Sequence, residues 1–194
     1  VGQGVLTVAH DSALGTTANG VTVSSDASLR VANGITITDA LNLSGSGYND
    51  SGALQLASGT ATVSGNIRFS TTVVSINSAG ALSLSGVIRG YDLASTGTGS
   101  LILSGTNAYW STTVSAGTLS VGFDSNLGID PITLASGTTL AVTGATTVDN
   151  AIVLTGAATI SNSVNATLSG VISGGHNLTK AGSGVLTLTG INSY

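Results

Sequence analysis

The sequence predicts an all-β protein, a single-domain right-handed parallel β-helix, from three observations. Long segments recur along the chain, short apolar alternations end in turn residues, and charge is scarce. The chain has 194 residues, of which 41% are hydrophobic and 6% charged, enough for residues 1–194 to bury one sizeable core. All eight acids are Asp, and Gly, Ser, Thr, Asn and β-branched residues dominate, a composition that favours strands and turns.

Internal repeats are the strongest of these signals. Residues 86–109 (GVIRGYDLASTGTGSLILSGTNAY) recur at 170–194 (GVISGGHNLTKAGSGVLTLTGINSY), 84 to 85 positions later. Leu6–Gly15 similarly resembles Leu119–Gly128. Such self-similarity is typical of stacked units that bury their apolar sides against one another. We therefore predict two imperfect repeat units, residues 1–113 and 114–194, with an extra coil inserted within residues 41–80.

Apolar residues alternate with polar ones in short runs that end in Ser-Gly or Asn-Gly dipeptides. Each run predicts a strand of three to five residues with one side facing inward. Strands this short suit the sides of a coil, and at roughly 20 to 25 residues per turn the chain would make about eight rungs. Stacked at ~4.8 Å, these give a rod of about 40 Å, and right-handed crossovers are strongly preferred. The alternating pairs are Val21/Val23, Ile35/Ile37, Leu41/Leu43, Leu54/Leu56, Leu82/Leu84, Leu101/Leu103, Leu119/Val121, Ile132/Leu134, Leu140/Val142 and Leu186/Leu188.

Composition also argues against several partners. The net charge is −4 with only four strong cations, which leaves no basic surface to neutralise the phosphates of a nucleic acid. No apolar run approaches the ~18 residues of a membrane-spanning helix, so we expect no membrane span in this segment. The absence of Cys excludes disulfides and thiol chemistry.

No pattern in the sequence is typical of a catalytic site. His10 and His176 lie at non-equivalent places in the repeat and are expected to be exposed turn residues. The acids are scattered, so neither a metal site nor the carboxylate cleft of a polysaccharide-acting β-helix enzyme is indicated. We expect no catalytic, cofactor-binding or metal-binding residues, no cofactor and no enzyme activity. A polysaccharide-acting enzyme remains the third functional alternative.

Two segments resemble a known family. Residues 182–194 (GSGVLTLTGINSY) and 97–128 (GTGSLILSGTNAYWSTTVSAGTLSVGFDSNLG) are similar to the passenger-associated repeat of bacterial autotransporters. The chain departs from that pattern at Trp110-Ser111, where the family usually has a Gly-containing turn. The resemblance implies a right-handed β-helix, exported to or released from the outer-membrane surface of a Gram-negative bacterium. In that family it lies between a signal peptide and a membrane barrel, neither of which is in this sequence, and the repeated helix is generally a stalk or scaffold.

The resemblance and the repeats favour a non-catalytic extracellular structural module, a stalk or a self-assembling fibre subunit. In the repeat alignment Val1 corresponds to Val114 and Tyr194 to Tyr109, so copies could stack head to tail through their terminal rungs. An excised piece of a longer stalk is the alternative interpretation. An adhesin passenger that binds a glycan or host protein is the second functional alternative. The expected contact surface comprises Val1, Tyr109, Trp110 and Tyr194.

Overall fold

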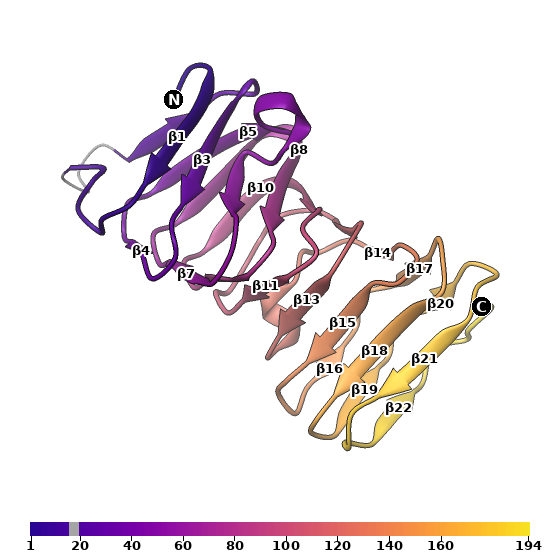
Figure 1. Cartoon of the computed structure of the whole chain (residues 1–194). Helices are drawn as coiled ribbons and strands as arrows, with labels where there is room; N and C mark the ends of the chain where they lie inside the picture. The colour runs from indigo at the N-terminus through magenta and orange to yellow at the C-terminus, as the bar shows by residue number, and fades with distance from the viewer. Residues whose placement is uncertain (16–19) are drawn as a thin grey trace.

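The chain coils into a parallel β-helix. The structure, a computed structural model, describes residues 1–15 and 20–194. Coils stack along one axis from β1 (Gly4–Val8) at the N-terminal end to β22 (Leu186–Leu188) near the other (Figure 1). Nine strands follow one another in the principal sheet, so the helix makes about nine turns. The predicted fold class is confirmed, with about one turn more than the eight expected.

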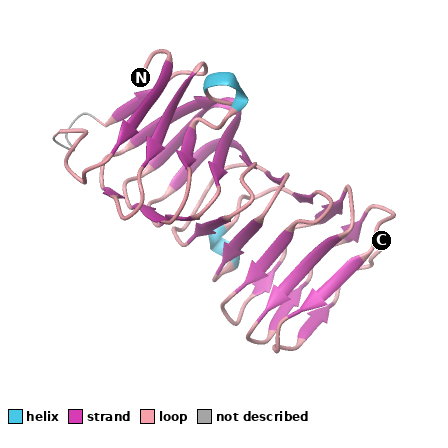
Figure 2. Cartoon of the chain, viewed as in Figure 1, coloured by secondary structure: helices cyan, strands magenta, loops and turns pink. Residues whose placement is uncertain are grey.

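Each coil has three faces, and strands stack in parallel on each of them. Figure 2 shows strands on all sides. In residues 1–15 and 20–194 the helical elements are two short turns, η1 (Tyr48–Asp50) and η2 (Asp124–Asn126). The first face contains β1, β3 (Ala27–Val31), β6 (Leu54–Leu56), the second halves of β8 (Ile67–Ser78) and β10 (Ile88–Ser95), β12 (Thr112–Val114), β14 (Ile132–Leu134), β17 (Ile152–Leu154) and β20 (Ile172–Ser173). The second contains β4 (Thr36–Ile37), β7 (Thr60–Val63), β9 (Ala81–Leu84), β11 (Ser100–Leu103), β13 (Thr118–Val121), β15 (Thr139–Val142), β18 (Ala158–Asn162) and β21 (Leu178–Ala181). The third contains β2 (Val21–Val23), β5 (Leu41–Gly45), the first halves of β8 and β10, then, beyond η2, β16 (Thr147–Val148), β19 (Ala166–Leu168) and β22. Within the described ranges, no helix has the length and apolar character needed to cross a bilayer.

Two strands are longer than predicted. β8 has 12 residues and β10 has 8, so the expectation of three to five residues is wrong for both. Residues 67–78 contain neither Gly nor Pro, and β8 continues around the corner from the third face to the first. β10 continues around the same corner although it contains Gly90. The pairing register shifts at this corner, between Gly90 and Asp92 of β10.

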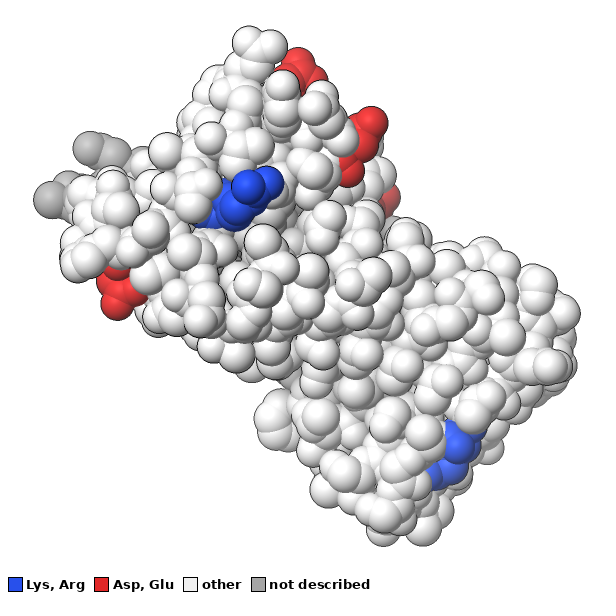
Figure 3. All heavy atoms as spheres, viewed as in Figure 1, with Lys and Arg blue, Asp and Glu red and all other residues white. Residues whose placement is uncertain are grey.

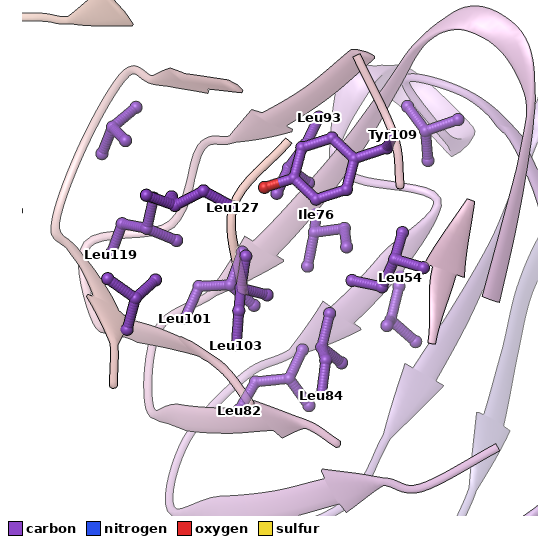
Figure 4. Packing of buried hydrophobic residues seen from close by; sticks show 14 of the residues in the cluster. Leu54, Ile76, Leu82, Leu84, Leu93, Leu101, Leu103, Tyr109, Leu119 and Leu127 are labelled. Atoms are coloured by element: carbon purple, nitrogen blue, oxygen red, sulfur yellow. The ribbon is translucent and has the colours of Figure 1, made fainter. Parts of the chain in front are cut away.

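Aliphatic side chains form columns inside the coil. Leu82, Leu101 and Leu119 stack in register on the second face and are fully buried. Figure 4 shows these side chains pointing into the interior together with Leu84 and Leu103. Each buried side chain of this size stabilises the fold by roughly 1.5–3 kcal/mol. The columns therefore supply most of the driving force for stacking one coil on the next.

The Ser-Gly corners bring successive coils into close contact. A Cβ atom on Gly86 would lie 2.1 Å from the carbonyl oxygen of Gly65, and one on Gly105 would lie 2.2 Å from that of Gly86. Atoms this close would overlap, so only Gly allows the backbones to approach at this corner. The recurring dipeptide is thus a stacking requirement as well as a turn signal.

The sequence repeat and the structural coil have different periods. The repeat aligns Ile88 with Ile172, 84 positions later. Ile88 pairs with Ile67 on the third face, whereas Ile172 pairs with Ile152 on the first. Ile172 lies four coils after Leu93, and Leu93 lies five residues after Ile88. The repeat from Ile88 to Ile172 is therefore five residues longer than four coils, and its second copy begins on the next face of the helix. The division into units 1–113 and 114–194, with an extra coil within 41–80, stays a prediction. The column that establishes the coil period is Leu93, Thr112, Ile132, Ile152 and Ile172.

Candidate functional site

Tyr109 lies in the core. Its side chain is completely buried, with its ring centroid 5.9 Å from that of Phe69. Its hydroxyl shares a 2.9 Å hydrogen bond with the Thr112 Oγ1 atom, and burial raises the pKa of Tyr109 to about 12. Figure 4 shows the ring above the aliphatic columns. Tyr109 therefore offers no area to a partner, which corrects the prediction that it contributes to a contact surface.

Two glycines make room for the Tyr109 ring. Gly90 follows Phe69 in the same column, and Gly128 lies against the other side of Tyr109. A Cβ atom on Gly128 would lie 2.7 Å from the Tyr109 ring and 2.0 Å from the Trp110 carbonyl oxygen. Large and small residues thus alternate along this column, which is how close-packed interiors accommodate aromatic rings.

The Asn of the repeat closes a corner between coils. The Oδ1 atom of Asn107 accepts a 2.8 Å hydrogen bond from the Ile88 amide, and its Nδ2 atom donates to the Asn126 carbonyl at 2.6 Å. Asn192, its counterpart, accepts from the Ile172 amide at 2.8 Å. This role was not predicted from the sequence, although the shared position of Asn107 and Asn192 in the repeat was a signal for it.

The other predicted contact residues lie apart. Val1 and Tyr194 lie at opposite ends of the rod (Figure 1). Val1 is half-buried and its amino group donates a 2.5 Å hydrogen bond to the Thr22 carbonyl. Tyr194 is 45% exposed on the last coil, and Trp110 is 49% exposed on the side of the helix. The four predicted residues therefore do not form one surface.

The last coil presents an apolar surface. Ile191 is 91% exposed, and Val185, Leu188 and Tyr194 are exposed beside it. Leu103, the repeat counterpart of Leu188, is fully buried. Leu188 and Tyr194 thus occupy motif positions that are buried within the rod, at Leu103 and Tyr109, but exposed on the last coil.

A groove of about 620 Å³ lies on the outer side of the third face, across β2, β5, β8 and β10. In-register pairing places Asn42, Arg68 and Arg89 on successive coils along its floor. Arg68 and Arg89 are both exposed. The groove was not predicted from the sequence.

Arg68 and Arg89 differ from the other two cations in their surroundings. Arg30 donates to the Gln55 Oε1 atom at 3.0 Å, and Lys180 donates to two backbone carbonyls. Within residues 1–15 and 20–194, no hydrogen bond or ion pair to the side chain of Arg68 or Arg89 is present. Charged side chains elsewhere are sparse, as the face shown in Figure 3 illustrates. Two neighbouring cations, with no counterion among the described residues, are therefore the main electrostatic feature of this surface.

An aromatic pair lies at one end of the groove. Tyr91 lines the groove, and its ring packs edge-to-face on Trp110 with centroids 5.0 Å apart. Both rings are more than one-third exposed. Exposed aromatic side chains that hold each other in place are common in binding surfaces, because they offer rigid contact area.

The described residues hold no group of three or more His, Asp or Glu side chains close enough to bind a metal ion. His10 and His176 are both exposed, and the Nδ1 atom of His10 accepts a hydrogen bond from the Ser12 amide at 3.1 Å. Their placement as exposed turn residues agrees with the sequence-based expectation.

Comparison with known proteins identifies two repeats. Residues 93–121 and 178–194 match the family described as passenger-associated-transport-repeat. The matched segments begin at the second half of β10 and at β21, and each includes a strand with alternating apolar residues, β11 or β22. No curated protein and no solved structure matches the chain. The matches and the parallel β-helix together support an autotransporter passenger β-helix.

Proposed function

We propose that this passenger β-helix is a non-catalytic structural module, a stalk at the surface of a Gram-negative bacterium. The observation that carries the proposal is the parallel stacking of about nine coils around one apolar core. A solenoid of this kind extends along its axis, since each coil contacts mainly its neighbours. Its outer surface is built largely from short, uncharged side chains, which suits a spacer.

Surface display tests the stalk role. We expect the chain, fused between a signal peptide and an outer-membrane barrel, to be detected by antibody on intact cells in a protease-resistant form. A Leu140→Asp variant places a charge in the buried column and should lose protease resistance. Matched Thr139→Asp, on the half-buried outward position beside it, should retain it. Failure of the unaltered chain to reach the surface, or release of fragments from a polysaccharide incubated with it, would overturn the proposal.

We further propose that the last coil stacks on the first coil of a second copy, so that copies join head to tail. The last coil exposes Val185, Leu188 and Ile191, and the first exposes Val5 and Leu6. Strand edges at both ends offer backbone N–H and C=O groups for parallel pairing. A contact between two different surfaces propagates into a filament.

Sedimentation velocity across a concentration series tests this assembly. We expect the unaltered chain to form larger species as concentration rises, and Leu188→Lys to remove them, because Leu188 pairs with the buried Leu168 and is exposed only on the last coil. Ile129→Lys is the control, because Ile129 is exposed, at 72%, but lies midway along the rod. A monomer at all concentrations, or equal effects of the two variants, would contradict head-to-tail stacking.

A second candidate function is adhesion to a glycan or host protein, favoured by the exposed Tyr91–Trp110 pair. Binding to a panel of immobilised glycans and host matrix proteins tests this role. Trp110→Ala should abolish the signal, whereas Phe123→Ala, at an aromatic residue 61% exposed elsewhere, should not. No binding in the panel, or binding that both variants reduce equally, would contradict adhesion through this pair.

A further inference from the structure

We propose that the groove on the third face binds a linear acidic polysaccharide, with Arg68 and Arg89 recognising its carboxylate or sulfate groups. The inference rests on the adhesin role proposed above and gives it a ligand class. It follows from the register of the third face, the donors on the groove floor and the aromatic pair at one end.

The register places two guanidinium groups on adjacent coils. Arg68 and Arg89 are paired across neighbouring parallel strands, which are separated by about 4.8 Å. Like charges on directly opposite positions destabilise a sheet. An anion bound between the two side chains would relieve this repulsion, and a guanidinium fork matches the paired oxygens of a carboxylate or sulfate.

The groove floor is rich in donors. Asn42 lies in register with Arg68, and its Oδ1 atom already accepts a hydrogen bond from the Ser70 hydroxyl. This bond engages the amide oxygen, and the two Nδ2 hydrogens are the donors that Asn42 can offer to a ligand. Asn42, Arg68 and Arg89 together present donors on three successive coils. A ligand that matches them must carry acceptors at regular intervals, as an acidic polysaccharide does.

The shape of the groove favours a linear polymer. The groove crosses four neighbouring strands, from β2 to β10, and its floor therefore follows the axis of the rod. Beyond Arg89, the Tyr91–Trp110 pair offers an apolar surface for the face of a sugar ring. A nucleic acid fits less well, because two cations neutralise few phosphates and the net charge is −4.

Calorimetric titration with defined polymers tests the proposal. The probes are polygalacturonate for carboxylate, dextran sulfate for sulfate, uncharged dextran and polyglutamate. We expect binding to at least one acidic polysaccharide, weaker at high salt, and none to dextran. The Arg68→Gln/Arg89→Gln double variant should lose about tenfold or more in affinity. Lys180→Gln, which removes one exposed charge at the other end of the rod, should change affinity less than about twofold.

Three outcomes would overturn the inference. These are no binding to either acidic polysaccharide, unchanged affinity in the double arginine variant, and equal binding of polyglutamate, which would assign the groove to acidic peptides. Trp110→Ala should weaken acidic polysaccharide binding several-fold. If both acidic polymers fail while a glycan panel still shows Trp110-dependent binding, the adhesin role stands and only the acidic ligand is wrong.

Discussion

Tyr109 and Tyr194 occupy the same position in two copies of one sequence motif, yet their environments are opposite. Tyr109 is fully buried between Phe69 and Gly128, whereas Tyr194 is 45% exposed on the last coil. The preceding Asn makes the same hydrogen bond in both copies, from the Ile88 or Ile172 amide. The motif therefore sets the local corner, and the coils stacked beyond it decide whether its aromatic residue belongs to the core.

This difference also shows where the stability of the rod resides. In a solenoid the free energy of unfolding is nearly a sum of contributions from neighbouring coils. A residue with coils on both sides contributes to two interfaces, and a residue on the last coil contributes to one. Matched substitutions in the two copies should therefore have unequal effects.

The largest difference is expected from truncating the two tyrosines. Tyr109→Ala leaves a cavity between Phe69 and Gly128 and should lower the free energy of unfolding by about 3–5 kcal/mol. Tyr194→Ala should lower it by less than about 1 kcal/mol, because its side chain is half-exposed. Urea denaturation of both variants measures the difference. Equal losses would show that the two positions are equivalent.

A second comparison tests the space beside the Tyr109 ring. Gly128→Ala forces a methyl group against the Tyr109 ring and the Trp110 carbonyl and should cost about 3 kcal/mol. Gly175→Ala is the control, because no atom lies within 4 Å of its added Cβ position, and it should be nearly neutral. Thermal unfolding followed by circular dichroism measures both. Unchanged stability of Gly128→Ala would mean that the ring is not confined as described.

The burial of Tyr109 also predicts a pH dependence. Its pKa is raised to about 12 in the folded state, against about 10 in the unfolded chain. The unfolded state therefore loses its proton first, and stability present below about pH 10 falls by up to about 3 kcal/mol as the pH rises to about 12. Tyr109→Phe lacks this ionisation, so its stability should fall less over the same range. Parallel pH profiles for the two proteins would contradict the buried hydroxyl.

The smallest of these differences concerns the Asn corner. Asn107→Ala breaks hydrogen bonds to the Ile88 amide and the Asn126 carbonyl in a buried site and should cost about 2 kcal/mol. Asn192→Ala breaks one bond on the partly exposed last coil and should cost about 1 kcal/mol or less. Hydrogen exchange at Ile88 and Ile172 measures the loss directly. If the Ile88 amide exchanged no faster in Asn107→Ala, the hydrogen bond from this amide to Asn107 would not be protecting it.

Local patterns in the sequence predicted much of the fold. The alternation at Leu82, Leu101, Leu119 and Leu140 identified strands that lie in register on the second face. The passenger-repeat resemblance was confirmed for residues 93–121 and 178–194. Period-2 patterns and turn residues are local properties, so they can be read without knowing which strands become neighbours.

The groove could not be predicted, because it depends on which residues become neighbours between coils. Asn42 and Arg68 are 26 positions apart, whereas Arg68 and Arg89 are 21 apart. A constant coil length would not align all three. The burial of Tyr109 was missed for a related reason, since it needs Gly90 and Gly128 on the coils to either side. Variation in coil length is thus the information that the local pattern lacks.

A disulfide between neighbouring coils tests parallel stacking in this register most directly. Thr133 and Val153 are half-buried outward positions paired across β14 and β17, and the natural chain has no Cys. At a strand spacing of about 4.8 Å, Thr133→Cys/Val153→Cys should form an intramolecular disulfide under mild oxidation without loss of stability. Thr133→Cys/Thr155→Cys, about 8 Å apart, should not. A disulfide in the second variant but not in the first would contradict the register on which this account depends.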